Sequence, residues 1–537
     1  MRFLFVFFLM VLAMGFAQAD HSGSPEKLGT VHFSTSCSAA TEPQFNRAVA
    51  LMHSFQFSRA IETFHAILAS DASCSMAYWG IALSSWGNPF AAGLKPQTQL
   101  DEGLKAVTLA RAAKPKTARE RAYVEAVTHL YVDTANTDQH SRVVAYESAM
   151  RAVSASYPGD TEAAIFYALA IAAAADPADK TYARQLKAGE ILDGLYAKYP
   201  DHPGLAHYII HAYDVPPLAV RAAGAAQHYS EIAPSAPHAL HMPSHTFTRL
   251  GEWQASIDAN VASAASARSE GQPIDELHAC DYLVYAYLQT AQDVAAQHVV
   301  ESAVQIFSRF DPNVPFGGAG SPATAYFARA AIPARYALER RAWADAARLE
   351  PVPSPFPQAE AITYFARGLG AAHLGDRATA RSAIASLEQS RDKLTKMKET
   401  YWANQVEIQR QEVAARLAFA EGKPLDALAG MRAVAAQEDE TEKSAVTPGP
   451  LAPAREQLGD LLLELKQASE ALKEFESTLV KEPNRFRSLY GAAEAARLGG
   501  DRETEQIYFK KLLKIAERAD QPGRQELDEA HREIHPE

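Results

Sequence analysis

The sequence has little clustered positive charge and few long apolar runs. Asp and Glu (64) outnumber Lys and Arg (52), which gives a net charge of −12 at pH 7. Because phosphate groups are bound by clustered Lys and Arg, we expect no nucleic-acid partner. After residue 19, no apolar run reaches the about 20 residues that a helix needs to cross a bilayer. The mature chain is therefore predicted to have no membrane span.

The one long apolar stretch opens the chain. Arg2 precedes an apolar run that ends at Ala17-Gln18-Ala19, a pattern typical of a secretory signal peptide cleaved after Ala19. Removal of residues 1–19 takes away Arg2 and no acidic residue, so the mature charge is 51 − 64 = −13. No Cys follows the cleavage site, which argues against a lipid anchor. We expect a periplasmic or secreted protein; an uncleaved anchor is the alternative.

Sequence patterns typical of β-strands are also scarce. Apolar residues instead recur three and four positions apart, which predicts a nearly all-helical chain. Residues 43–74 and 451–486 each combine small, Ala, aromatic and Pro positions at the spacing of a tetratricopeptide repeat of about 34 residues. Residues 361–388 form a further unit. The chain thus resembles the tetratricopeptide repeat (TPR) family over most of residues 41–520, which implies an all-α, TPR-like α-solenoid of stacked antiparallel helix pairs with a concave inner surface.

Changes of composition divide the predicted array into segments. In chain order they are a signal peptide (1–19), an N-terminal TPR-like array with a His-rich groove (37–310), a Gly/Pro-rich connecting region (311–357), middle TPR-like helices (358–436), a charged, solvated linker (437–450), a C-terminal TPR pair (451–520) and a polar tail that frays (521–537).

Histidine is concentrated in two short segments. Residues 202–214 and 238–249 together hold six of the 18 His. When the units are aligned on their internal turns, one begins at Pro203 and the next at Pro237, 34 residues later. His207 and His211 then occupy positions 5 and 9 of the first unit, as His241 and His245 do in the second. Residues four apart share a helical face, and in the resembled family positions 5 and 9 face the groove.

A third unit, beginning at Leu277, places His278 at position 2, which His238 occupies in its own unit, and Asp281 at position 5. Imidazoles that meet across stacked helices can share a metal ion, zinc or a similar divalent transition metal. Asp281 or Asp214 is expected to bind the ion directly or to orient an imidazole. The candidate ligands are His207, His211, His238, His241, His245, His278 and Asp281.

Two considerations argue against a regular series of metal ligands along the groove. Pro243 is expected to start a helix near Met242, which would leave His241 in a turn and off the helical face of His245. Packing and hydrogen bonding without a metal are the plainer alternative for the cluster. His53, His65, His129 and His373 are interpreted as ordinary isolated histidines.

The sequence predicts catalysis only weakly. The His207-to-His211 spacing is that of a zinc protease helix, but no Glu follows the first His. No Gly-x-Ser-x-Gly motif occurs in the groove region. The leading hypothesis is an exported solenoid that binds a protein or peptide partner in its groove and carries a His-rich metal site. The alternative is a metal-dependent enzyme, a hydrolase or a catalyst of oxygen chemistry, that uses the same histidines. No oligomeric state is predicted.

Three segments carry a finer resemblance. Ala-Tyr-Trp-Gly-Ile-Ala-Leu at 77–83, His-Pro-Gly-x-x-His-Tyr at 202–208 and His-x-x-His-Met-Pro-Ser-His at 238–245 resemble a group of secreted bacterial TPR proteins. The resemblance runs from about residue 37 to residue 330. It implies the fold and export, and it implies no reaction because the group has no settled biochemical role.

The repeat register also bears on the three cysteines. Cys37 and Cys74 lie 37 residues apart, about one repeat, so the helix starts beside them are expected to be neighbours. An exported protein meets an oxidising compartment, where this pair is the candidate disulfide. Free buried thiols are the alternative. Cys280 is expected to be buried and unpaired.

Overall fold

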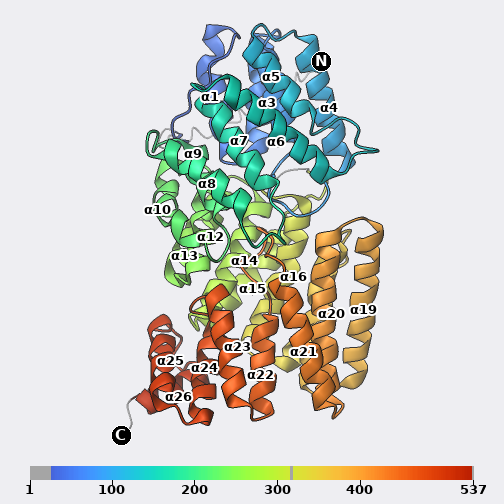
Figure 1. The fold of residues 1–537 in the computed structure, drawn as a ribbon, viewed down its shortest axis with the longest axis vertical. Coiled ribbons are helices and arrows are strands. Elements are labelled where there is room, and N and C mark those ends of the chain that lie inside the picture. The colour runs from blue at the N-terminus through green and yellow to red at the C-terminus, as the bar shows by residue number, and fades with distance from the viewer. Residues whose placement is uncertain (1–25, 315–317, 535–537) are drawn as a thin grey trace, which may run out of the picture.

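The computed structural model describes residues 26–314 and 318–534, so the predicted signal peptide at 1–19 lies outside the described residues. Within them the chain is built from helices and turns, without a strand. Figure 1 shows an elongated array that runs from the N-terminal helices at one end to the C-terminal helices at the other. The predicted all-α, TPR-like solenoid is confirmed.

The helices follow one another with short connections. The first group comprises α1 (Glu42–His53), α2 (Phe57–Ser70), α3 (Ser75–Ser85), α4 (Gln97–Ala112), α5 (Ala118–Thr128), α6 (Gln139–Ser156), α7 (Thr161–Ala173) and α8 (Ala183–Tyr196). The central group comprises α9 (Pro203–Ala212), α10 (Ala223–Ile232), α11 (Pro237–His241), α12 (Pro243–Leu250), α13 (Trp253–Ser269), α14 (Pro273–Gln289), α15 (Asp293–Ser308), α16 (Pro322–Glu339) and α17 (Trp343–Arg348). The last group comprises α18 (Pro357–His373), α19 (Arg377–Lys396), α20 (Thr400–Ala420), α21 (Pro424–Asp439), α22 (Ala454–Glu464), α23 (Ala468–Lys481), α24 (Phe486–Gly499), α25 (Arg502–Ile515) and α26 (Gln525–Ile534). Two 3-10 helices, η1 (Ala39–Thr41) and η2 (Ala219–Ala222), complete the set.

Most helices pack on the next helix along the chain, and the turn inside many pairs contains one residue in the left-handed conformation. Such a residue ends a helix by reversing the chain direction within a few positions. In the turns at Gly251 and Ala291, these residues have φ values of 68° and 54°. The other left-handed turn residues of this kind include Phe55, Gly375, Lys466 and Gly500.

Small residues allow helices to cross closely against aromatic rings. A Cβ atom added at Gly80 would lie 2.2 Å from Cζ of Phe64, and one added at Gly491 would lie 2.4 Å from Cζ of Phe475. Both rings are fully buried. The small and aromatic positions of the repeat pattern therefore meet in space, and each helix pair completes its core on its neighbour.

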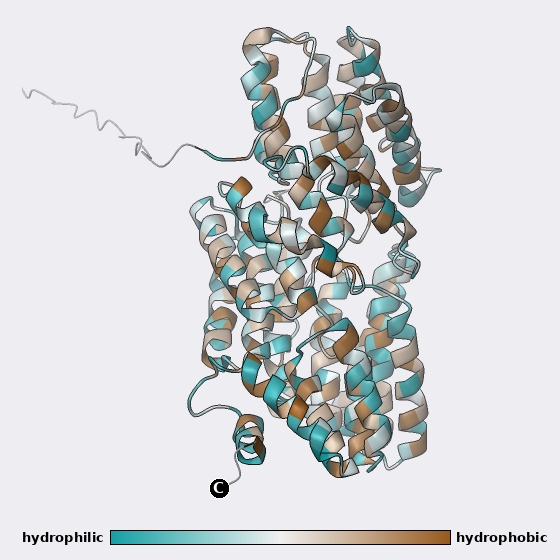
Figure 2. Cartoon of the chain, turned by 60° about the vertical axis from the view of Figure 1, so that its left-hand side comes forward, coloured by the Kyte–Doolittle hydropathy of each residue, from teal (hydrophilic) through white to brown (hydrophobic). Residues whose placement is uncertain are grey.

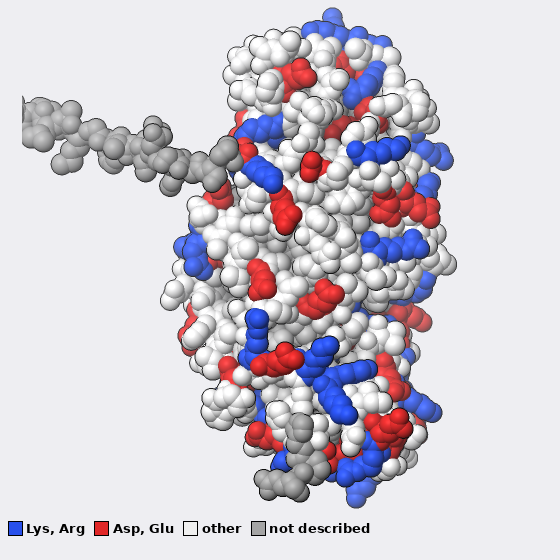
Figure 3. All heavy atoms as spheres, turned by 90° about the vertical axis from the view of Figure 1, so that its left-hand side faces the viewer, with Lys and Arg blue, Asp and Glu red and all other residues white. Residues whose placement is uncertain are grey.

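The outer surface is polar and mixed in charge. In Figure 2 hydrophobic and hydrophilic residues alternate along individual helices, as expected where each helix buries one face. Figure 3 shows acidic and basic side chains scattered over one face of the molecule. None of the described helices is long and apolar enough to cross a membrane.

Three of the predicted connecting segments differ from the structure. The region 311–357 contains two helices, α16 and α17. The segment 437–450 begins with the end of α21 and continues as a loop in which none of residues 441–450 is exposed, so the prediction of a solvated linker was wrong. The tail forms α26, which buries Leu527 and Ala530. The charged and polar composition of 437–450 and 521–537 suggested exposure to solvent. In the structure, Lys443 and Arg524 instead pair with acidic side chains inside the fold.

The cysteines lie at the N-terminal end of the array and in its middle. The sulfurs of Cys37 and Cys74 are joined in a disulfide, with Cα atoms 4.9 Å apart. Cys280 is free and buried in α14.

Candidate metal centre

Six buried imidazoles lie on α9, α11, α12 and α14. Figure 1 shows α9, α12 and α14 in the green part of the array, between the N-terminal and the C-terminal helices. We call the six imidazoles the histidine row, and none is more than 8% exposed. The row consists of His207 and His211 on α9, His238 and His241 on α11, His245 on α12 and His278 on α14.

The row divides into two triads. In the first triad (His207, His211 and His238) each residue offers a ring nitrogen within 4.8 Å of those of the other two, and the second triad (His241, His245 and His278) meets the same condition. Ring centroids lie 4.8–6.3 Å apart in the first triad and 4.4–6.4 Å apart in the second. Each triad can therefore hold a metal ion after small side-chain shifts.

The two triads are related by the repeat. Each combines positions 5 and 9 of one unit with position 2 of the next, so His238 completes the first triad and His278 completes the second. The sequence register placed these residues on one wall of the array. It did not show which unit supplies the third nitrogen of each triad, because that depends on how neighbouring units rotate.

Pro243 breaks the helix as predicted, with α11 ending at His241 and α12 starting at Pro243. Met242 between them nevertheless keeps helical angles, φ −53° and ψ −36°. The backbone path therefore continues for a further turn without the hydrogen bond that Pro cannot donate. As a result, His241 and His245 still project to the same side, and the expectation that they part was wrong.

Two polar side chains fix the tautomers of the second triad. His241 Nδ1 lies 2.6 Å from Asn260 Oδ1, and the Asn260 amide nitrogen donates to the carbonyl of Ser256 at 2.8 Å. That second bond leaves Asn260 Oδ1 as an acceptor, so His241 Nδ1 carries the hydrogen. His245 Nδ1 lies 2.9 Å from Oδ2 of Asp214.

Asp214 is held ionised and is therefore also an acceptor. Arg249 Nε donates to its Oδ1 at 2.9 Å, and Lys443 Nζ lies 3.2 Å from its Oδ2. Burial alone would raise the pKa of Asp214, but Lys443, Arg249 and the bond to His245 hold that pKa well below its ordinary value. His245 Nδ1 consequently donates its hydrogen to Asp214, and the sequence-based expectation that Asp214 orients an imidazole describes this contact.

The outcome is a close approach of two nitrogen lone pairs. His241 Nε2 and His245 Nε2 lie 3.1 Å apart, and neither carries a hydrogen when both rings are neutral. Two nitrogens bound to one tetrahedral zinc ion lie about 3.3–3.4 Å apart, given Zn–N bonds of about 2.0–2.1 Å. The Tyr282 hydroxyl, 3.3 Å from His245 Nε2, has a single proton and cannot satisfy both nitrogens. The distance between the two nitrogens is therefore close to that of two imidazoles bound to one metal ion.

A backbone carbonyl orients one histidine of the first triad. His207 Nδ1 donates to the carbonyl oxygen of His53 at 2.6 Å, which leaves His207 Nε2 without a hydrogen. Nε2 of His207, His211 and His238 are all buried and have no hydrogen-bond partner. Three such nitrogens in one place are rare in a protein interior, where polar atoms are nearly always paired.

His53 is not an isolated histidine, contrary to its interpretation from sequence. Its Nε2 lies 2.9 Å from one carboxylate oxygen of Glu162, and His202 Nε2 lies 2.9 Å from the other. The Tyr208 hydroxyl lies 3.0 Å from His53 Nδ1. These buried contacts fix His53, whose carbonyl orients His207. The sequence held no signal for this support because Glu162 lies on α7, far from the histidine segments.

Burial keeps all six imidazoles neutral. It lowers the pKa of His207 and of His278 to about 3, and it lowers the pKa of His245 below its ordinary value despite Asp214. Burial, with repulsion among neighbouring rings, holds the pKa values of the other three, His211, His238 and His241, well below that of a free imidazole. Neutral imidazole is the form that binds metal.

Asp281 does not join either triad. Its Oδ1 pairs with Arg335 Nε at 2.8 Å, and both side chains are fully buried. Arg335 also donates to the Thr447 hydroxyl and to the carbonyls of Gly449 and Pro450. Asp281 thus holds the 440–450 loop through Arg335, which corrects its expected role as a ligand.

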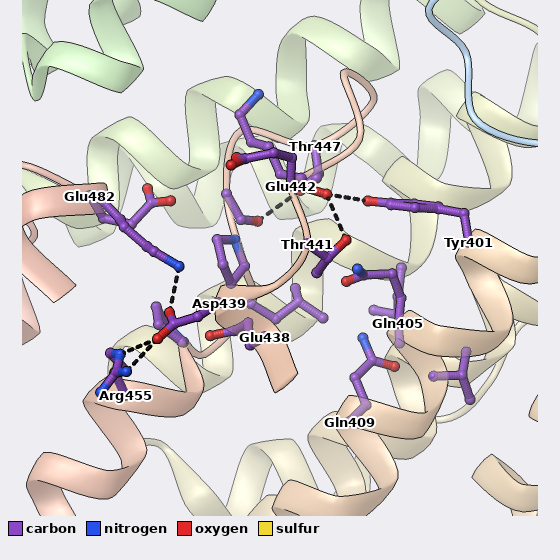
Figure 4. Close-up of a pocket in the computed structure, with 18 of the residues that line it drawn as sticks. Tyr401, Gln405, Gln409, Glu438, Asp439, Thr441, Glu442, Thr447, Arg455 and Glu482 are labelled. Carbon is purple, nitrogen blue, oxygen red and sulfur yellow. Dashed lines mark hydrogen bonds and ion pairs between the residues drawn. The ribbon is translucent and has the colours of Figure 1, made fainter. Parts of the chain in front are cut away.

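Aromatic rings and two loops cover the row. Phe90 stacks on His211 with ring centroids 4.1 Å apart, and Phe55 stacks on His238 at 5.4 Å. The 440–450 loop is held on one side by Lys443 at Asp214 and on the other by Tyr401 (Figure 4), whose hydroxyl donates to the Glu442 carbonyl at 3.0 Å.

Two cavities reach the row past these covers. One, of about 310 Å³, is lined by Phe90, His211, Asp214 and Lys443 among others. The other, of about 150 Å³, reaches His238 and His278. Small solutes therefore have a path to both triads, while the row itself is covered by this chain's own segments.

Comparisons with solved structures find helical proteins of low identity. The human IFIT1 dimer with m7Gppp-AAAA is 10% identical, with 82% of this chain and 90% of that chain covered and a TM-score of 0.39. Naa15/Naa10 bound to HypK-THB is 10% identical, with 91% and 90% covered and a TM-score of 0.24. Such TM-scores carry no argument about binding. No protein-family model and no curated protein matches the chain, so membership of the secreted bacterial TPR group stays a prediction.

Proposed function

We propose that this protein is a metal-binding helical-repeat protein in which the second triad holds a divalent transition metal ion. The observation that carries the proposal is the 3.1 Å approach of His241 Nε2 to His245 Nε2, with both Nδ1 atoms donating to oxygen acceptors. A cation between the two nitrogens turns this repulsive contact into a pair of bonds. His278 supplies the third ligand, and zinc or a similar ion suits three imidazoles with one open coordination position.

A proton is a poorer occupant than a metal. One shared proton would make an imidazolium in a site where burial already lowers the pKa of both His241 and His245. A metal ion gains three ligands at once and has its orienting partners, Asn260 and Asp214, in place. The donor set therefore favours a transition metal over protonation.

Export is part of the proposal. The disulfide between Cys37 and Cys74 supports it, because such bonds persist mainly in oxidising compartments. We place the expected protein or peptide partner away from the histidine row, since Phe90 and the 440–450 loop already cover that part of the array.

Metal-dependent catalysis is a second candidate function. Three imidazoles leave one coordination position open, and the cavity of about 150 Å³ reaches His278. A small substrate could therefore bind the ion, whereas a protein partner could not enter this cavity.

Metal analysis of untagged protein purified without chelators tests the proposal. We expect stoichiometric metal in the wild type and its loss in H241A/H245A. The matched control is H65A/H298A, which removes two exposed histidines and should retain the metal. If the wild type is metal-free after incubation with zinc, copper, nickel or cobalt salts, or if the two double variants bind alike, the proposal is wrong. Steady-state assays with small ester and phosphate substrates then separate binding from catalysis.

A further inference from the structure

The two triads lie against one another. The His211 and His245 ring centroids are 5.8 Å apart, and those of His238 and His241 are 5.9 Å apart. These distances between triads fall inside the 4.4–6.4 Å range found within the triads. The histidine row is therefore continuous, and ions in the two triads would be direct neighbours.

One ion cannot serve the whole row. A transition metal site of this type takes three imidazoles and leaves a position for a small ligand, whereas the row offers six imidazoles with one ligand nitrogen each. All three Nε2 atoms of the first triad are buried and unpartnered. If only the second triad were loaded, these three buried nitrogens would remain without a partner, which is rare in protein interiors.

The donor chemistry favours copper. All six candidate ligands are neutral imidazoles, and the carboxylate that bonds His245, Asp214, is also bound by Arg249 and Lys443. Among first-row divalent ions, nitrogen sites bind Cu²⁺ most tightly. The Cys280 thiol lies on α14 beside Glu276 and Arg268 and belongs to neither triad.

Aromatic rings and one carboxylate lie beside the two triads. Phe55 and Phe90 stack on rings of the first triad, while Tyr282 packs within 5.0 Å of the ring centroids of His241 and His245. Asp214 supplies a negative charge at the contact between the triads through His245. The two cavities allow a water molecule, hydroxide or another small ligand to reach the ions.

From these observations we infer that the two triads form a single dinuclear copper centre, with one ion held by three imidazoles in each triad and a small ligand shared between the ions. The inference rests on the proposed metal-binding function and goes beyond it in the number, identity and coupling of the ions.

The test loads the full-length protein with Cu(II) and measures copper per chain together with the electron paramagnetic resonance spectrum. We expect two copper ions per chain, with a spin count well below two or a half-field transition, because the neighbouring spins interact. H207A/H238A and H241A/H278A should each hold one copper with the full signal of one isolated spin. H65A/H298A should match the wild type.

The outcomes separate the inference from the proposed function. Two full isolated spins in the wild type, or a wild type that binds only one copper and loses it in either triad variant, would overturn the dinuclear centre and leave metal binding intact. Retention of zinc after competition with an equal concentration of copper would overturn the choice of metal. Absence of any bound metal would refute the proposed function itself. The wild-type spectrum decides the coupling even if a triad variant fails to fold.

Discussion

Replacement of Asn260 by Leu is the sharpest single test of the proposed metal centre. Asn260 touches no candidate metal position, yet its Oδ1 holds the hydrogen of His241 on Nδ1 through a buried 2.6 Å bond. Leu has a similar size and no acceptor. In the variant the hydrogen can move to His241 Nε2, where it meets His245 Nε2 at 3.1 Å and forms an N–H···N hydrogen bond.

This shift of the hydrogen from Nδ1 to Nε2 determines how much metal affinity the variant loses. The metal-free variant loses little stability, because its new hydrogen bond replaces the old one. To bind metal, however, His241 must return the hydrogen to Nδ1, where no acceptor remains, and an unpartnered buried donor costs about 1–3 kcal/mol. The metal affinity of N260L is therefore expected to fall about 10- to 100-fold, as for other residues that orient metal ligands, which corresponds to about 1.4–2.8 kcal/mol.

The assay is a competition titration against a chromophoric chelator, with thermal unfolding of the metal-free protein in parallel. N260D retains an acceptor for His241 and should bind metal more tightly than N260L. N46L is the matched control, since Asn46 bonds the Phe33 amide far from the row. Equal metal affinities of N260L and the wild type, or an equal loss in N46L, would refute the argument from tautomers.

Three further predictions follow from other parts of the structure. F90A should release metal to a chelator faster than the wild type, measured by stopped flow, because Phe90 covers His211. Burial raises the pKa of Asp275 to about 7, so folding retains a proton that the unfolded chain loses near pH 4. Stability should therefore fall from pH 4 to pH 7, by at most about 4 kcal/mol, and this slope should be absent from D275N in denaturant titrations. Removal of the disulfide in C37S/C74S should destabilise the N-terminal helices by up to about 4 kcal/mol, estimated from its 37-residue separation.

Each of these predictions has its own control. For Phe90, F307A removes a ring that packs on Phe310 and Tyr326 rather than on a histidine, and it should leave the release rate unchanged. For Asp275, only the slopes against pH are compared, because an Asn amide would meet the N–H groups of Ala319 and Gly320 and lower stability at every pH. A parallel slope in D275N would contradict the raised pKa. For the disulfide, a reducing agent should lower the stability of the wild type to that of C37S/C74S and leave C37S/C74S itself unchanged.

Periodicity was sufficient to predict the solenoid because its rules are local. The recurrence of apolar residues and the small and aromatic positions around Phe64 and Phe475 recur within about 34 residues, and each helix pair packs mainly on the next. The same local reasoning failed at Lys443. A charged segment is exposed to solvent unless an oppositely charged side chain of the fold pairs with it. The partner of Lys443 is Asp214, 229 residues earlier in the chain, and the sequence pattern did not indicate this pairing.

The sequence predicted which histidines form the candidate site better than it predicted which of them lie next to one another. The 34-residue register placed His207 with His241 and His211 with His245. The register could not show that His238 and His278 complete the triads, because the rotation between units decides which ring reaches which neighbour. Nor could it identify Asn260, whose role depends on a single buried hydrogen bond.

Spacing along one or two repeats was enough to predict the architecture and the wall on which the histidines lie. Tertiary contacts decide the tautomers of His207, His241 and His245, and they set the exposure and nearest neighbours of all six imidazoles. Those properties depend on contacts such as Asp214 with Lys443 and His207 with the His53 carbonyl, which join residues more than 150 positions apart. Burial in a shared interior, rather than the pattern along the chain, makes six ordinary side chains into a candidate metal centre.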